Sequence, residues 1–157
     1  MTEEKGRESR EANALFYVCS LIEFIARMTK NRRNLVAARL GEAKLRKMFD
    51  LADVYHSDNI ERVASDFIAA SEIETGSYDN VSKCRYSVPS HWDIGKVYKR
   101  LILGVAKDKG VDLIAALQLV YDSFLAEKID DYNTSVYYDS PAAHLADFKM
   151  GSLSAEQ

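Results

Sequence analysis

Residues that break regular structure are scarce in this 157-residue chain, which has only two prolines and seven glycines. Apolar residues recur at steps of three and four along most of its length, and no alternating apolar and polar run is long enough to require a sheet. This spacing predicts an all-α protein. We expect one compact helical bundle, because a chain of this size buries roughly 70% of its unfolded surface as a single domain.

Cysteines and long apolar runs are also few. Cys19 and Cys84 are too far apart for a disulfide framework or a thiolate zinc site, which favours a reducing, cytoplasmic setting. The longest apolar stretch, residues 14–26, is interrupted by Ser20 and Glu23 and is shorter than the roughly 20 residues that span a bilayer. The segment before it mixes acids with bases, unlike a signal peptide. We therefore expect a soluble protein with no membrane partner.

The apolar spacing predicts about six helices and a short last one. The first, at residues 11–28, is apolar on nearly every side, so we expect a central helix surrounded by the others. The others are expected at residues 32–40, at 42–54, after Asp58, between Ser90 and Gly110, at 113–128 and at 142–148. Residues 11–150 thus form one predicted domain with a soft subdomain boundary at 74–89, a flexible leader at 1–10 and a flexible tail at 151–157.

Several helix ends carry local signals. The expected caps are Gly41 after the second helix, Asp58 before the fourth, a capping box of Ser90 and Asp93 before the fifth, Gly110 after it and Asp112 before the sixth. Glu23 is an acid inside the apolar first helix, where burial would disfavour its ionised form. We expect it to emerge at the rim of the bundle or to pair with Arg27, four residues on.

Common catalytic motifs are missing. The chain has no Gly-x-Ser-x-Gly turn and no glycine-rich phosphate loop, which argues against an ATP-dependent or dinucleotide-dependent enzyme. Each histidine has an aspartate two or three residues away, a pattern compatible with a metal site or a histidine–aspartate hydrogen bond: His56 with Asp58, His91 with Asp93 and His144 with Asp147. Helix capping explains the aspartates better. We predict no catalytic residue, metal or cofactor, and three histidines that do not converge.

Charge comes in alternating blocks. Residues 27–47 carry eight bases and one acid, residues 48–82 eight acids and one base, residues 83–110 seven bases and two acids, and residues 111–157 eight acids and two bases. The first basic block contains the candidate binding residues Arg32, Arg33, Lys44 and Lys47. It is compatible with a solvated or internally neutralised face, with a protein-binding surface, or with nucleic-acid binding through phosphate contacts.

Nine tyrosines and one tryptophan are many for this length. Five of the tyrosines fall in two segments without helical spacing, residues 74–89 and 130–141. They are either half-buried over the bundle or anchors of an interface, because tyrosine and tryptophan combine contact area with a polar group. The candidate aromatic binding residues are Trp92, Tyr132, Tyr137 and Tyr138. Complementary charge blocks and an aromatic centre also favour a twofold homodimer.

Three segments carry a resemblance: Ala14-Leu-Phe-Tyr-Val-Cys-Ser-Leu-Ile-Glu23, Leu51-Ala-Asp-Val-Tyr-His56 and Asn59-Ile-Glu-Arg-Val-Ala-Ser-Asp-Phe-Ile68. Over about residues 12–75 the chain resembles a family of small, uncharacterised helical bacterial proteins. Members are often encoded beside toxins of the ADP-ribosyltransferase fold, which implies an antitoxin-like role by direct binding. We thus expect a non-enzymatic, bacterial, cytoplasmic protein-interaction module, with a nucleic-acid-binding regulator that uses residues 27–47 as the alternative.

Overall fold

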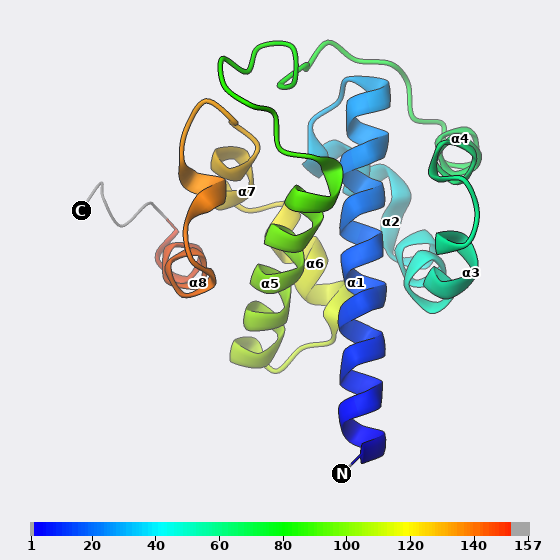
Figure 1. Ribbon diagram of the computed structural model, residues 1–157, viewed down its shortest axis with the longest axis vertical. Helices are drawn as coiled ribbons and strands as arrows, with labels where there is room; N and C mark the ends of the chain where they lie inside the picture. Colours follow the sequence, from blue (N-terminus) through cyan, green and yellow to red (C-terminus); the bar gives the residue numbers. More distant parts are fainter. Residues whose placement is uncertain (1, 152–157) are drawn as a thin grey trace.

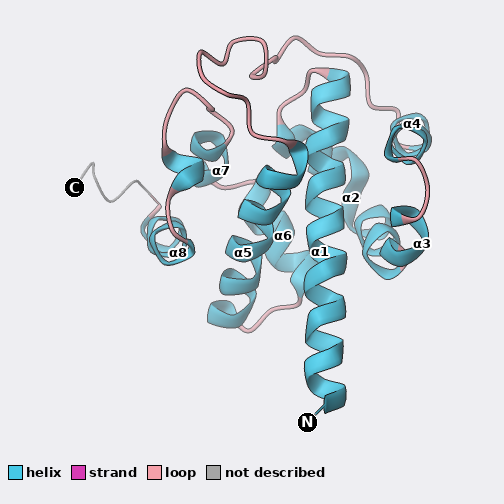
Figure 2. Ribbon diagram, viewed as in Figure 1, coloured by secondary structure: helices cyan, strands magenta, loops and turns pink. Residues whose placement is uncertain are grey.

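The computed structural model describes residues 2–151, with side chains described from residue 9 onward. Over this range it contains eight α-helices, one 3-10 helix and no strand, which confirms the all-α prediction (Figures 1 and 2). The predicted tail lies outside the described range apart from Gly151. The elements are α1 (Thr2–Thr29), α2 (Arg33–Asp50), α3 (Ala52–His56), α4 (Ile60–Ala70), α5 (His91–Lys109), α6 (Leu113–Tyr121), α7 (Phe124–Ile129), η1 (Val136–Tyr138) and α8 (Pro141–Met150).

Helix α1 is the centre of the bundle, as its all-round apolar surface predicts. It contacts α2, α3, α4 and α5, and α3 and α4 lie on one side of it while α7 and α8 lie on the other (Figure 1). Leu21, Ile22 and Ile25 are fully buried. Each such side chain stabilises the fold by roughly 1.5–3 kcal/mol relative to an exposed one.

The stretch Ser9–Thr29 of α1 is long and apolar enough, by length and composition, to cross a membrane. This stretch is longer than the apolar run read from the sequence. Of its most apolar 18-residue window, 61% is buried inside the bundle. The same test is passed by a signal sequence and by the core helix of a soluble protein, and burial on all sides is what a core helix requires.

Helix α1 also begins earlier than predicted, at Thr2 instead of Glu11. Most of the expected leader therefore continues the core helix. Residues 2–10 are mainly good helix formers, with acidic residues near the positive end of the helix dipole. This part of the helix was not predicted from the sequence, because residues 2–10 lack the apolar spacing on which the prediction was based.

Most predicted caps are present. Ser90 Oγ accepts a hydrogen bond from Asp93 N at 3.0 Å, and Asp93 Oδ2 accepts one from Ser90 N at 2.9 Å, which completes the capping box of α5. Gly110 ends α5 in the left-handed conformation, and the Asp112 side chain caps α6. The cap predicted for α4 is wrong by one residue. Asn59, not Asp58, accepts the bond from Glu61 N, because Asn59 directly precedes the first helical residue.

The structure divides three of the predicted helices differently: those at 32–40 and 42–54 are joined in α2, and the one at 113–128 is split. Gly41 has φ 73° and ψ 170°, so it kinks α2 between the two helices expected on either side of it. Only glycine adopts these angles without strain. The segment predicted as one helix at residues 113–128 is two helices, since the Ser123 side chain accepts a bond from Ala126 N and starts α7.

Helices α1 and α5 approach closely at Ser20 and Gly95. A Cβ atom on Gly95 would lie 2.9 Å from both N and Cα of Ser20 and would also meet its Oγ. Backbone atoms cannot move aside as a flexible side chain can. Gly95 therefore allows the packing that places the start of α5 against the middle of α1.

The long connection between α4 and α5, residues 71–90, passes over the end of α1 (Figures 1 and 2). Gly76 N donates to Thr29 O at 2.7 Å, and Tyr78 N donates to Lys30 O at 2.9 Å. Asn31 Nδ2 donates to Glu74 O at 2.7 Å. The segment expected as a soft boundary is thus fixed to the turn between α1 and α2.

Candidate functional site

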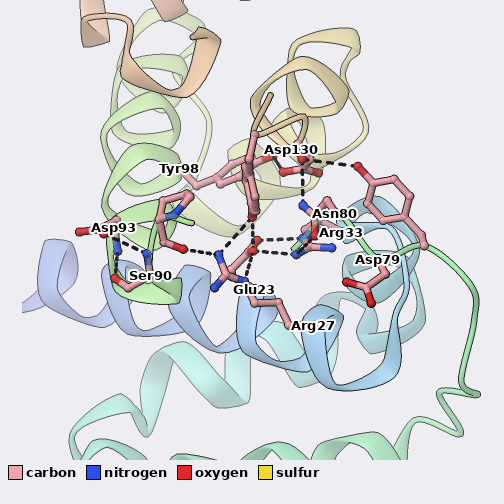
Figure 3. A network of polar contacts seen from close by, with 12 residues as sticks. Glu23, Arg27, Arg33, Asp79, Asn80, Ser90, Asp93, Tyr98 and Asp130 are labelled. Atoms are coloured by element: carbon pink, nitrogen blue, oxygen red, sulfur yellow. Dashed lines mark hydrogen bonds and ion pairs between the residues drawn. The ribbon is translucent and has the colours of Figure 1, made fainter. Parts of the chain in front are cut away.

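Glu23 is the centre of a polar network inside the bundle (Figure 3). Arg33 Nε donates to Glu23 Oε1 at 2.8 Å, and Arg33 Nη2 donates to Oε2 at 2.7 Å. Arg27 Nε and the hydroxyl of Tyr132 also donate to Oε2. The predicted pair with Arg27 is confirmed, but Glu23 is 1% exposed and does not lie at the rim.

The network continues from Arg33 into two other segments. Arg33 Nη2 donates to Asn80 Oδ1 at 3.1 Å, and Asn80 Nδ2 donates to the backbone oxygen of Asp130 at 2.8 Å. The Asp130 carboxylate accepts a bond from the Tyr98 hydroxyl at 2.7 Å. Helices α1, α2, α5 and α7 and the connection at residues 71–90 are therefore joined through buried polar groups (Figure 3).

The two buried carboxyls of this network have opposite pKa shifts. Burial by itself raises the pKa of Glu23, but Arg33 and Arg27 outweigh it and hold the pKa at about 2. Burial raises the pKa of Asp130 to about 7, and the negative charge of Glu23 adds to the effect. Glu23 is thus ionised at neutral pH, whereas Asp130 is close to its midpoint.

The same network holds the tyrosine-rich segments in place. Arg27 Nη2 donates to the backbone oxygen of Pro89 at 2.7 Å. Its guanidinium carbon lies 5.5 Å from the ring centre of Tyr132. Farther along these segments, Arg85 N donates to Asn133 Oδ1 at 2.8 Å. The connection before α5 and the segment after α7 are therefore held side by side.

A tyrosine-lined hollow opens between these two segments, and we name it the tyrosine hollow. Tyr138 is 74% exposed and Tyr86 is 65% exposed, more than the intermediate burial that is usual for tyrosine. The rings of Tyr137 and Tyr138 are 4.3 Å apart, and Tyr132 meets Tyr137 edge on at 5.8 Å. The lining is Tyr86, Ser87, Tyr132, Asn133, Thr134, Ser135, Tyr137 and Tyr138.

A second hollow adjoins the first and shares Ser87, Tyr137 and Tyr138 with it. We name it the α5 hollow, because one helix supplies its charged wall. Lys96 and Arg100 line it together with apolar groups that include Pro89 and Val97. The two hollows are therefore adjacent, and the exposed ring of Tyr138 lines both of them.

The structure separates the predicted aromatic binding residues. Tyr138 is exposed, whereas Tyr132 and Tyr137 are 2% and 7% exposed and form the floor of the tyrosine hollow. Trp92 belongs to another cluster, with Phe16 and His56 as ring neighbours at 5.6 and 5.7 Å. No ring contact among the described residues joins Trp92 to Tyr137 or Tyr138. The single aromatic centre expected for a homodimer is therefore divided between two places.

The predicted basic binding residues are divided too. Arg33 is 1% exposed, so the expectation that it lies on a binding surface is wrong. It is buried because its charge pairs with Glu23, which lies ten residues away on another helix. Arg32 is exposed but lies over the ring of Tyr78 at 4.5 Å. Lys47 is exposed and Lys44 is half-buried.

Much of the basic block is neutralised within the chain. Arg46 pairs with both Glu42 and Asp112 at 3.0 Å. Arg27 and Arg33 share Glu23, and Lys30 lies 3.9 Å from Asp79. Arg39, Lys44 and Lys47 form no ion pair among the described residues. Three free cations on one helix are a small surface for binding phosphates.

The three histidines do not meet at one point, although two of them share a neighbour. His56 and His91 lie 5.7 and 4.6 Å from the ring of Trp92. His144 is buried elsewhere, with Nε2 2.6 Å from the backbone oxygen of Val136. In the part of the chain that the structure describes, no group of three or more histidine, cysteine, aspartate or glutamate residues is placed to hold a metal ion.

These features differ in what they can do. Both carboxylate oxygens of Glu23 already accept hydrogen bonds from within the chain, so this carboxylate supports the fold and is not open to a ligand. The hollows instead expose rings and hydroxyls, which suit binding. No protein-family model, no curated protein and no solved structure matches the chain, so the resemblance to antitoxin-like proteins stays a prediction.

Proposed function

We propose that this protein is a non-enzymatic interaction module of a bacterial cytoplasm and that it binds a protein partner through the tyrosine hollow. One observation carries the proposal: Tyr86 and Tyr138 stay 65% and 74% exposed beside a concave surface. Exposed tyrosines are typical anchors of protein interfaces, because they bury a large area and also form hydrogen bonds.

The support beneath the hollow adds to this proposal. Tyr132 forms part of its floor and donates its hydroxyl hydrogen bond to the buried Glu23. A surface held in one conformation before binding loses less conformational entropy when the partner arrives. The hollow therefore suits a partner that binds a preformed shape. The resemblance to antitoxin-like proteins makes a toxin of the ADP-ribosyltransferase fold the first partner to test.

The experiment is affinity capture from native lysate, with and without nuclease, using the wild-type chain and two variants. Tyr86→Ser with Tyr138→Ser removes the exposed rings. Leu119→Ser is the matched control, since Leu119 is an exposed apolar residue of α6 that lines neither the tyrosine hollow nor the α5 hollow. We expect a protein that survives nuclease treatment, is lost with the tyrosine variant and is kept with the control. Recovery of nucleic acid alone would contradict the proposal.

Self-association is tested separately. The alternating charge blocks predict a dimer in which the basic block of one copy meets an acidic block of the other. Light scattering at low and high salt gives the mass in both conditions. A monomer in both rules out the dimer, whereas a dimer that survives high salt depends on aromatic contacts more than on charge.

A further inference from the structure

The wall of the α5 hollow carries positive charge that the chain does not neutralise. Lys96 and Arg100 lie one helical turn apart on α5, and both are exposed. Neither forms an ion pair among the described residues, in contrast to Arg27, Arg33 and Arg46. Burial lowers the pKa of the neighbouring Lys99, and repulsion from Arg100 and Lys96 lowers it further.

Two carboxylates also line the α5 hollow, but they leave this charge available. Asp93 is occupied locally, because its Oδ2 accepts from Ser90 N in the capping box and its charge faces the positive end of the α5 dipole. Asp139 is exposed and is not paired with Lys96 or Arg100. Lys96 and Arg100 therefore outnumber Asp139, the one carboxylate of the lining that is not part of a cap.

Most of the rest of the lining is apolar, and its polar members are Ser87 and His144. The apolar part consists of Val88, which is 40% exposed, Pro89, Val97, Pro141 and the rings of Tyr137 and Tyr138. An apolar or aromatic side chain that enters the hollow would contact these groups, while charges next to it in sequence would reach the wall. A segment that suits both parts combines carboxylates with an apolar residue.

We propose that the α5 hollow binds an acidic segment of the partner protein, with carboxylates on Lys96 and Arg100 and a neighbouring apolar side chain against Tyr137, Tyr138 and Pro89. This inference rests on the proposed function and names the chemistry of the partner. Arg100 presents a planar guanidinium that can hold a carboxylate by two hydrogen bonds, and Lys96 presents a point charge one turn away.

The first test uses an array of immobilised peptides, each with one central phenylalanine or leucine flanked by glutamates, glutamines or lysines, probed with the labelled full-length chain. We expect the glutamate peptides to bind most strongly and their binding to weaken as salt rises. Equal binding to all three classes, or binding to none, would contradict the inference. Displacement of the glutamate peptides by a short single-stranded oligonucleotide at lower concentration would also contradict it, because the surface would then favour phosphates.

The second test reverses the charge of the wall. Lys96→Glu with Arg100→Glu should weaken binding of the best glutamate peptide by about tenfold or more, since each lost charge-assisted hydrogen bond contributes on the order of tenfold. Arg39→Glu with Lys47→Glu makes the same change of charge on α2, where both residues are exposed and unpaired. The affinity of this control for the same peptide should stay within about twofold of the wild-type value, because its charges lie outside the hollow.

Capture of the partner separates the two proposals. If Tyr86→Ser with Tyr138→Ser abolishes capture and the Lys96→Glu with Arg100→Glu variant captures as well as wild type, the proposed function stands and the acidic-segment inference fails. If neither variant changes capture, both fail. If the charge reversal and the tyrosine variant both abolish capture while the α2 control keeps it, both are supported.

Discussion

Glu23 and Arg33 form a two-point ion pair inside the bundle, with both carboxylate oxygens accepting from one guanidinium at 2.8 and 2.7 Å. Both side chains are 1% exposed. A buried charge without its counter-charge is strongly destabilising, so each member of the pair depends on the other. The pair also fixes the position of Tyr132, which donates to the same carboxylate and contributes to the tyrosine hollow.

Glu23→Gln should therefore destabilise the fold by about 3–5 kcal/mol, because it keeps the shape of the side chain and leaves the Arg33 charge uncompensated. Urea unfolding followed by circular dichroism measures the change in the free energy of unfolding. Glu42→Gln is the control, since it removes an exposed partner of Arg46 and should have no measurable effect. Equal results for the two variants would show that the buried pair does not support the fold.

The raised pKa of Asp130 predicts that the stability of the fold depends on pH. Because its pKa in the folded chain is raised to about 7, the fold favours the protonated form. This contribution is fully present below the unfolded pKa, near 4, and is lost as pH rises through about 7. Glu23 acts in the opposite direction. Its pKa of about 2 means that its contribution is present above about 4.5 and is lost as pH falls toward 2.

Asp130→Asn isolates the first of these effects. Asparagine keeps an oxygen that can accept from the Tyr98 hydroxyl and carries no charge at any pH. We expect the wild type to lose stability between about pH 5 and pH 8 relative to the variant, and the variant to be the more stable of the two at pH 8. Unfolding free energies measured across this range decide the matter. Parallel curves for the two chains would contradict the assignment.

Gly95→Ala should destabilise strongly, because the new Cβ would lie 2.9 Å from two backbone atoms of Ser20. Overpacking of this kind costs typically 1–3 kcal/mol or more. Gly104→Ala on the same helix is the matched control, since its Cβ would only meet the side chain of Leu145 at 3.5 Å. Alanine favours a helix over glycine by about 1 kcal/mol, so the control should be neutral or stabilising. Thermal unfolding measures the stability of the two variants. Similar losses of stability for both would argue against a close helix contact at Gly95.

Local signals in the sequence predicted local structure well. The capping box of Ser90 and Asp93, the end of α5 at Gly110 and the central place of α1 all follow from residues that are neighbours in the sequence. The cap of α4 was misplaced by one residue, because Asp58 and Asn59 are adjacent and both suit that position. The early start of α1 was missed, since residues 2–10 lack apolar spacing.

The candidate site depended on contacts between distant residues, which composition does not reveal. Glu23 stood out as an acid in an apolar helix, and its partner four residues away was predicted. Its main partner, Arg33, belongs to a basic block that resembles an exposed surface in the sequence. Another partner, Tyr132, lies 109 residues from Glu23 in the sequence. Trp92 was grouped with Tyr137 and Tyr138 by residue type alone, whereas its ring neighbours are Phe16, His56 and His91.

Site-specific photo-crosslinking in native lysate tests most directly whether the tyrosine hollow is the binding surface. Benzoylphenylalanine replaces Tyr138 in one chain and Leu119 in another, two exposed positions of which only the first lines the hollow. We predict a crosslinked protein from position 138 that is absent from position 119 and disappears when unlabelled wild-type chain is added in excess. Crosslinks of equal strength from both positions, or from position 119 alone, would contradict a partner bound at the tyrosine hollow.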